Sequence, residues 1–113
     1  MAKFRVTYIS ERVSKNDTQQ MLLQPFDSHR VDRDASAKPV WCVWLPTASV
    51  PTYMALLEQA KAEEKIFTVE ANLVGITAQP VFTKQDGSKQ QDLVIKFAGK
   101  VNKSVEADVA VEW

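Results

Sequence analysis

Residues 50–76, VPTYMALLEQAKAEEKIFTVEANLVGI, contain the change of pattern that decides the fold. In the first half, apolar residues recur at the i, i+3, i+4, i+7 spacing of one helical face, which predicts a helix over residues 50–65. Ser49 is a suitable N-cap, and Pro51 falls in the first turn, where its missing N–H costs little. The apolar residues of this stripe are Tyr53, Leu56, Leu57 and Ala60.

The second half of this stretch, residues 66–76, changes to strict alternation, which predicts a half-buried strand. Gly75 near its end indicates a bulge or bend. Residues 3–10 alternate in the same way, so Phe4, Val6 and Tyr8 are expected on one face. The remaining predicted strands are 39–46, 81–84, 92–99 and 105–113.

Two local features refine this strand pattern. Residues 39–46, PVWCVWLP, are apolar on both faces, which is typical of a central strand or of a subunit contact. Residues 85–88, Gln-Asp-Gly-Ser, carry the Asp-Gly signal of a tight hairpin. Short antiparallel strands in this number predict a mainly β fold, a small five-stranded barrel of the oligonucleotide-binding (OB) type, with one α-helix inserted between strands.

Residues 11–38 differ from the rest because they are polar and interrupted by Pro25. A long polar segment inside a small domain is usually functional or mobile. We interpret it as a flexible wing that projects from a single domain covering residues 1–113, with Met21 to Phe26 as its most ordered part.

The composition limits the class of protein. The chain has 14 basic and 14 acidic residues. Zero net charge argues against an indiscriminate polyanion binder, yet leaves room for a basic groove balanced by acids elsewhere. The single cysteine fits a reducing compartment, the N-terminus lacks the apolar run of a signal peptide, and no stretch is long enough for a membrane span. The sequence therefore predicts a cytoplasmic protein without a membrane partner.

Catalytic chemistry is poorly represented. One histidine and one cysteine cannot form a zinc site, and the three glycines are scattered. Cys42 lies in an apolar strand, where a thiol is usually inert, so a pair with His29 is not expected. Acidic and basic residues interleave around Asp32, which is typical of a solvated loop. We expect no enzyme activity, no metal and no cofactor.

Binding chemistry is better represented. Single-strand binding needs cations for phosphates and aromatic faces on which bases stack. The candidates for base stacking are Phe26, Phe82 and one of Trp41 or Trp44. The candidates for phosphate contact are Arg5, Arg12, Lys15, Arg30, Arg33, Lys84, Lys89 and Lys96. Each also has a structural interpretation, since apolar strands usually pack and many lysines are ordinary surface charge.

The segments PVWCVWLP, IFTVEANLVGI and DLVIKFAGKV, in this order after KFRVTYIS and a polar wing, resemble the small single-stranded-DNA-binding proteins of filamentous bacteriophages. The resemblance covers most of the chain as a pattern, without a signature motif. It implies an OB barrel, a homodimer or higher oligomer, and cooperative coating of single-stranded DNA in phage or plasmid replication. By position, it also implies that Phe26 in the wing and Phe82 in the second loop reach DNA.

The chain departs from that family in a longer helix, a less basic composition and an acidic end, residues 104–113. That end could contact a host or replication protein. The balanced charge and the two-sided apolar strand also suit a different class, a protein–protein interaction module such as a phage or plasmid inhibitor or an immunity-type protein. This alternative stays open on the sequence.

Overall fold

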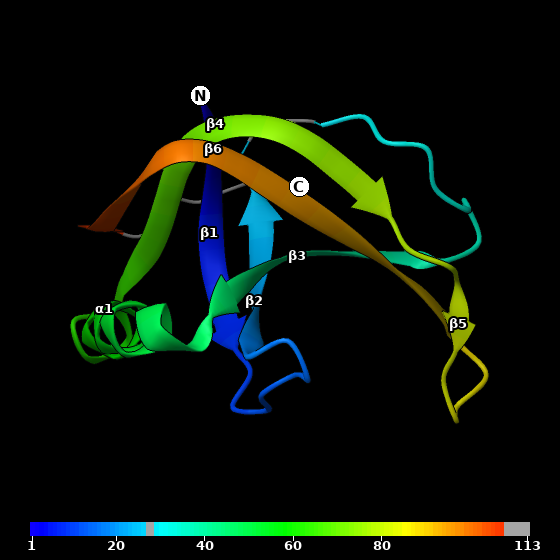
Figure 1. Cartoon of the computed structure of the whole chain (residues 1–113), viewed down its shortest axis with the longest axis horizontal. Helices are drawn as coiled ribbons and strands as arrows, with labels where there is room; N and C mark the ends of the chain where they lie inside the picture. Colours follow the sequence, from blue (N-terminus) through cyan, green and yellow to red (C-terminus); the bar gives the residue numbers. More distant parts are fainter. Residues whose placement is uncertain (27–28, 108–113) are drawn as a thin grey trace.

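The computed structural model describes residues 1–26 and 29–107 (Figure 1). Its elements are β1 (Ala2–Ile9), β2 (Thr18–Pro25), β3 (Lys38–Pro46), a 3-10 turn η1 (Thr47–Ser49), α1 (Val50–Ala62), β4 (Lys65–Ala78), β5 (Phe82–Thr83) and β6 (Lys89–Ala107).

Five of these strands close into a barrel, in the order β3-β2-β1-β4-β6, because β6 pairs back onto β3. The β3–β6 pairing is parallel and the other barrel pairings are antiparallel. The short β5 adds to β6 outside the barrel. The prediction of a mainly β, OB-like barrel with one helix between strands is confirmed.

One apolar cluster fills the barrel. Its most buried large side chains include Phe4, Met21, Phe67, Val69 and Ile95, each at most 2% exposed. They come from all the barrel strands except β3, which adds Val43 and Leu45. Full burial of such a side chain contributes about 1.5–3 kcal/mol, so this cluster holds the five strands together.

The helix α1 covers one end of the barrel (Figure 1). Its predicted stripe is confirmed: Tyr53, Leu57 and Ala60 are buried, and Leu56 packs partly against the core. The helix ends at Ala62 rather than at residue 65. Within the described residues, no helix is long and apolar enough to cross a membrane.

Two details of the helix differ from the sequence prediction. Ser49 occupies the N-cap position, but its side chain makes no capping hydrogen bond, because it is the last residue of the 3-10 turn and has helical rather than extended backbone angles. At the other end, Glu64 takes a positive φ of 55°. This turn of the backbone directs Lys65 into β4, so Lys65 is not helical.

The predicted wing is two loops on either side of a core strand. The strand β2 runs through residues 18–25, and its Met21 and Leu23 are buried between β1 and β3. Among the described residues, what remains between these strands is the loop of residues 10–17 and the segment of residues 29–37. The interpretation of 11–38 as one projecting segment is therefore wrong, and β2 is the fifth barrel strand.

The end of the chain also differs from the prediction. The strand β6 is continuous from Lys89 to Ala107, so the expected strand 92–99 and the start of the expected strand 105–113 are one element. Gly99, at a φ of 72°, bends it without ending it. Residues 108–113 lie outside the described residues. The bulge at Gly75 is confirmed by a register shift between Leu73 and Gly75.

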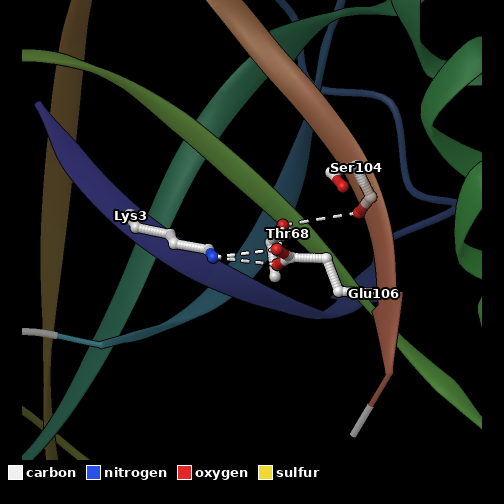
Figure 2. A network of polar contacts seen from close by, with 4 residues as sticks. All are labelled: Lys3, Thr68, Ser104 and Glu106. Atoms are coloured by element: carbon white, nitrogen blue, oxygen red, sulfur yellow. Dashed lines mark hydrogen bonds and ion pairs between the residues drawn. The ribbon is translucent and has the colours of Figure 1, made fainter. Parts of the chain in front are cut away.

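A polar network ties three strands together on the outer face of the barrel (Figure 2). Lys3 on β1 lies 2.9 Å from Glu106 Oε2 on β6. Thr68 on β4 lies between them, with its hydroxyl 2.8 Å from the same carboxylate oxygen. The hydrogen bonds from Lys3 and Thr68 hold the pKa of Glu106 below its ordinary value. Glu106, which the sequence placed at the start of a last strand and in an acidic end, is therefore part of β6 and of this network.

Replacing Glu106 with Gln tests this network. A lowered folded-state pKa adds stability above the ordinary glutamate pKa of 4.5, and this stability is lost as the pH falls through the folded pKa. We expect Glu106→Gln to lower the free energy of unfolding at pH 7 by under about 1 kcal/mol, because the pair is partly exposed. Urea denaturation should show this difference shrinking below pH 4.5.

The matched control is Glu58→Gln, which removes an exposed carboxylate on α1. The difference in free energy of unfolding between Glu58→Gln and wild type should not shrink below pH 4.5. The network would be contradicted if Glu106→Gln lowered the free energy of unfolding by the same amount at pH 7 and below pH 4.5.

Candidate nucleic-acid interface

The outer face of β2 and β3 carries an exposed tryptophan. On β3, Val43 and Leu45 face the core, so Trp44 between them faces outward, and it is 44% exposed. Its neighbour across the strand pair is Gln20 on β2. Burial thus distinguishes the two tryptophans of β3, since Trp41 packs against the core cluster.

The loop of residues 10–17 places a cation beside Trp44. The backbone N–H of Ser10 donates to Gln20 O at 2.8 Å, and that of Ser14 donates to Thr18 O at 2.8 Å, which closes the loop on itself. A hollow of about 190 Å³ is then lined by Arg12 and Trp44 together with three polar residues, Ser10, Ser14 and Gln20. Lys15 is exposed at the tip of the same loop.

On its other side, Trp44 borders a second hollow. Pairing between β3 and β6 ends at Cys42 and Val94, and beyond this point a cavity of about 510 Å³ opens between the two strands and α1. Lys96 and Trp44 both line it. Most of its other walls are apolar: Met21, Val43, Leu45, Tyr53, Ile95, Phe97 and Val101. Trp44 therefore has Arg12 on one side and Lys96 on the other.

The β5–β6 hairpin lies near the opposite end of β3. Lys84 N–H donates to Ser88 O at 2.8 Å, and Gly87 has a φ of 87°, so the predicted Asp-Gly turn is confirmed. Phe82 is 45% exposed and pairs with Gln90, which also pairs with Lys38 at the start of β3. The hairpin lysines Lys84 and Lys89 are exposed.

The outer face of β3 thus connects the hairpin to Trp44. Lys38 and Trp44 are six residues apart, which is about 20 Å along a strand. We call the outward-facing side of β3 from Lys38 to Trp44 the β3 strip. Arg12 and Lys96 lie at its Trp44 end. One acid, Asp92, pairs with Val40 within it.

Three more of the residues predicted to bind DNA lie together near residues 29–33. Arg30, Arg33 and Trp41 line one hollow of about 770 Å³, beneath residues 29–33. The Trp41 ring lies 6.3 Å from Phe4 and 5.9 Å from His29. Trp41 is therefore half-buried at the end of the barrel rather than on the β3 strip.

Arg5 and Phe26 lie apart from these groups. Arg5 lines a small hollow beside α1, together with Lys61 and Lys65. Phe26 is half-buried, its backbone N–H donates to Lys3 O at 3.1 Å, and Lys3 Nζ lies 5.1 Å from its ring centre. These contacts fasten Phe26 to the barrel.

Tyr8 lies on the outer face of the barrel. The prediction that it shares a face with Phe4 and Val6 is wrong. A register shift between Val6 and Tyr8 reverses the alternation of β1, so Ile9 is buried and Tyr8 is 52% exposed. Tyr8 pairs with Leu22, the β2 residue next to Cys42. No turn residue within KFRVTYIS indicates the bulge, so strict alternation could not reveal it.

Cys42 is completely buried although it lies on the outer side of β3. Leu22 and Val94 on the neighbouring strands flank it. Burial raises the pKa of the Cys42 thiol, while a hydrogen bond with Gln20 acts in the opposite direction and is weaker. The thiol is therefore held in its protonated form, which is a poor nucleophile.

Comparison of the chain with protein-family models, with curated proteins and with solved structures finds no match.

The burial of Cys42 makes its reactivity a test of the outer face. We expect the native protein to react with a thiol reagent such as DTNB far more slowly than the urea-unfolded chain, because the thiol is both buried and protonated. Absorbance at neutral pH follows the reaction. Rapid stoichiometric labelling of the native protein would show that Leu22 and Val94 do not cover Cys42.

Proposed function

We propose that this protein binds single-stranded DNA without sequence specificity, along the β3 strip and with Trp44 as the main stacking platform. The β2–β3 face, together with the loop after β1, is where OB barrels bind oligonucleotides. An aromatic face accepts any base, so a stacking platform does not select a sequence. The proposed place of action is the cytoplasm, in DNA replication.

The observation that carries the proposal is the position of Trp44. Trp44 is 44% exposed, so burial of this large apolar side chain contributes little to stability. It lies between Arg12 and Lys96 and lines three hollows. Exposed aromatic faces bordered by cations are what single-strand binding requires. Phe82 and the hairpin lysines extend the same combination to the other end of the β3 strip.

The zero net charge is compatible with this arrangement because several acidic residues lie away from the β3 strip, while Glu11, Asp17 and Asp86 share the two loops with its cations. Of the acidic side chains, Glu106 is paired with Lys3, and Glu58, Glu63 and Glu64 lie on or just after α1. The phosphates would contact Arg12, Lys96 and the lysines of the hairpin. Binding should therefore weaken as salt rises, although the chain as a whole is neutral.

Replacing Trp44 with Ala is the direct test of stacking. Loss of one stacked base costs roughly 1–3 kcal/mol, so the dissociation constant for a labelled oligo(dT) should rise by about 5- to 150-fold. Fluorescence anisotropy at low salt measures it. Trp44→Phe should keep much of the affinity, because an aromatic face remains.

The control for this variant is Gln59→Ala, which removes an exposed side chain on α1 that lines none of the three hollows around Trp44. Circular dichroism should show that all three variants fold. The proposal fails if wild-type protein does not bind oligo(dT) at low salt, or if Gln59→Ala and Trp44→Ala change the affinity equally.

Salt dependence separates the roles of the cations from that of the ring. Each neutralised phosphate of a single strand contributes about 0.7 to the slope of log K against log salt. We expect Arg12→Gln and Lys96→Gln each to reduce the slope by about that amount. Trp44→Ala should lower affinity and leave the slope unchanged. Equal slopes for all four proteins would show that these cations do not contact phosphates.

A second candidate function, a protein–protein interaction module, has one observation in its favour. The cavity beside Trp44 is mostly apolar and, at about 510 Å³, could accept an apolar side chain of a partner. A stoichiometric protein partner that remains bound after nuclease treatment, and is lost in Trp44→Ala, would favour this function. Binding of oligo(dT) by purified protein would favour DNA.

A further inference from the structure

The hollow under residues 29–33 is separate from the β3 strip, and we call it the loop cleft. It has a volume of about 770 Å³, and its walls come from the loop, from the inner side of β3 and from β6. The residues that line it are His29, Arg30, Val31, Asp32, Arg33, Pro39, Trp41 and Leu93. Two guanidinium groups, one carboxylate and two aromatic rings therefore share a single cavity.

Hydrogen bonds within the loop, and one to the barrel, fix the position of residues 33–37. Arg33 Nη1 donates to the carbonyl oxygens of Asp34 and Ala37, at 3.1 and 2.9 Å. The N–H of Asp34 donates at 2.8 Å to the side chain of Gln91, which is buried on β6. A guanidinium carries five N–H groups, so Arg33 keeps further donors for a ligand while its position is held.

His29 forms part of the wall in a defined position. Its ring stacks on Phe4 at 5.5 Å with an interplanar angle of 17°, and lies 5.9 Å from the ring of Trp41. Its Nε2 atom is buried and has no hydrogen-bond partner among the described residues. An unsatisfied buried polar atom is rare in a folded protein, and a ligand in the cleft would give it a partner.

These groups match the parts of a nucleotide. Arginine side chains bind phosphate oxygens in a bidentate manner, and a carboxylate such as Asp32 accepts hydrogen bonds from the exocyclic amine of a base. Trp41 presents an aromatic ring to the cavity. A phosphomonoester carries more negative charge than the diester within a strand, so a pair of arginines favours it.

We propose that the loop cleft binds a nucleoside phosphomonoester, with its phosphate on Arg30 and Arg33 and its base against Trp41. Such a group exists in a free mononucleotide and at the phosphorylated end of a strand. Only the strand-end source rests on the proposed function. The cleft is distinct from the strip around Trp44, because the two share no lining residue.

The test uses the free mononucleotide first. Titration of ¹⁵N-labelled protein with dCMP should shift the indole N–H signal of Trp41 to saturation. The variants Trp44→Phe and Trp113→Phe assign the three indole signals of the chain. Deoxycytidine, which lacks the phosphate, should bind about tenfold more weakly or worse. Arg30→Gln should weaken dCMP binding by a similar factor, since Arg30 is exposed and its loss should not disturb folding.

The matched control is Lys100→Gln, which removes an exposed cation on β6 that lines none of the hollows described above. It should leave dCMP binding unchanged. The proposal is overturned if dCMP and deoxycytidine bind equally, if neither binds, or if dCMP shifts the signal of Trp44 instead. It is also overturned if Lys100→Gln and Arg30→Gln have equal effects.

A second experiment distinguishes a free mononucleotide from the phosphorylated end of a strand as the ligand. Oligo(dC), whose bases carry the same exocyclic amine as dCMP, is compared with a 5′-phosphate and with a 5′-hydroxyl, and the comparison is repeated at the 3′ end. A phosphate preference that disappears in Arg30→Gln assigns the strand end, whereas dCMP binding without that preference assigns the free mononucleotide. If neither oligo binds, the proposed function fails, and the dCMP titration still decides the cleft.

Discussion

The parallel pairing of β3 with β6 is the constraint on which the rest of the structure depends. It joins residues 38–42 to residues 90–94 and converts an open sheet into a closed barrel. Closure gives β3 a buried inner side and an outer side bounded by β2 and β6. Because the pairing stops at Cys42 and Val94, the strands separate directly before Trp44, and the apolar cavity opens there. The end of one ladder thus positions both the tryptophan and the hollow beside it.

The two tryptophans of β3 illustrate how one strand serves both the fold and the proposed binding. Trp41 faces inward at the end of β3 that lies beneath residues 29–33, and there it contacts Phe4 and His29. Trp44 faces outward at the opposite end, beside the loop of residues 10–17. The first lines a polar cleft suited to a phosphorylated nucleotide, and the second lines an exposed strip suited to stacked bases. Both proposals therefore depend on the same alternation of β3.

Sequence patterns predicted the elements whose periodicity is clear: the helix stripe around Tyr53, the Asp-Gly hairpin and the bulge at Gly75. They missed β2, because TQQMLLQP contains consecutive apolar residues and a proline instead of clean alternation. They divided β6, because Gly99 resembles a strand end, whereas here it bends a strand whose pairing with β4 continues. For the site, the residue types were predictable, but their grouping was not. The pairing of β2 with β3 brings Arg12 beside Trp44, whereas the residues that lead into β3 bring Arg30 beside Trp41.

The central claim is that the outer face of β3, with its neighbouring loops, is the surface that meets single-stranded DNA. The most direct measurement is a map of backbone amide chemical shifts on titration with oligo(dT). The account predicts the largest changes in residues 10–17, 40–46 and 84–89. It would be contradicted by changes concentrated on the opposite face around Lys3, Thr68 and Glu106, or by no change at low salt (Figure 2).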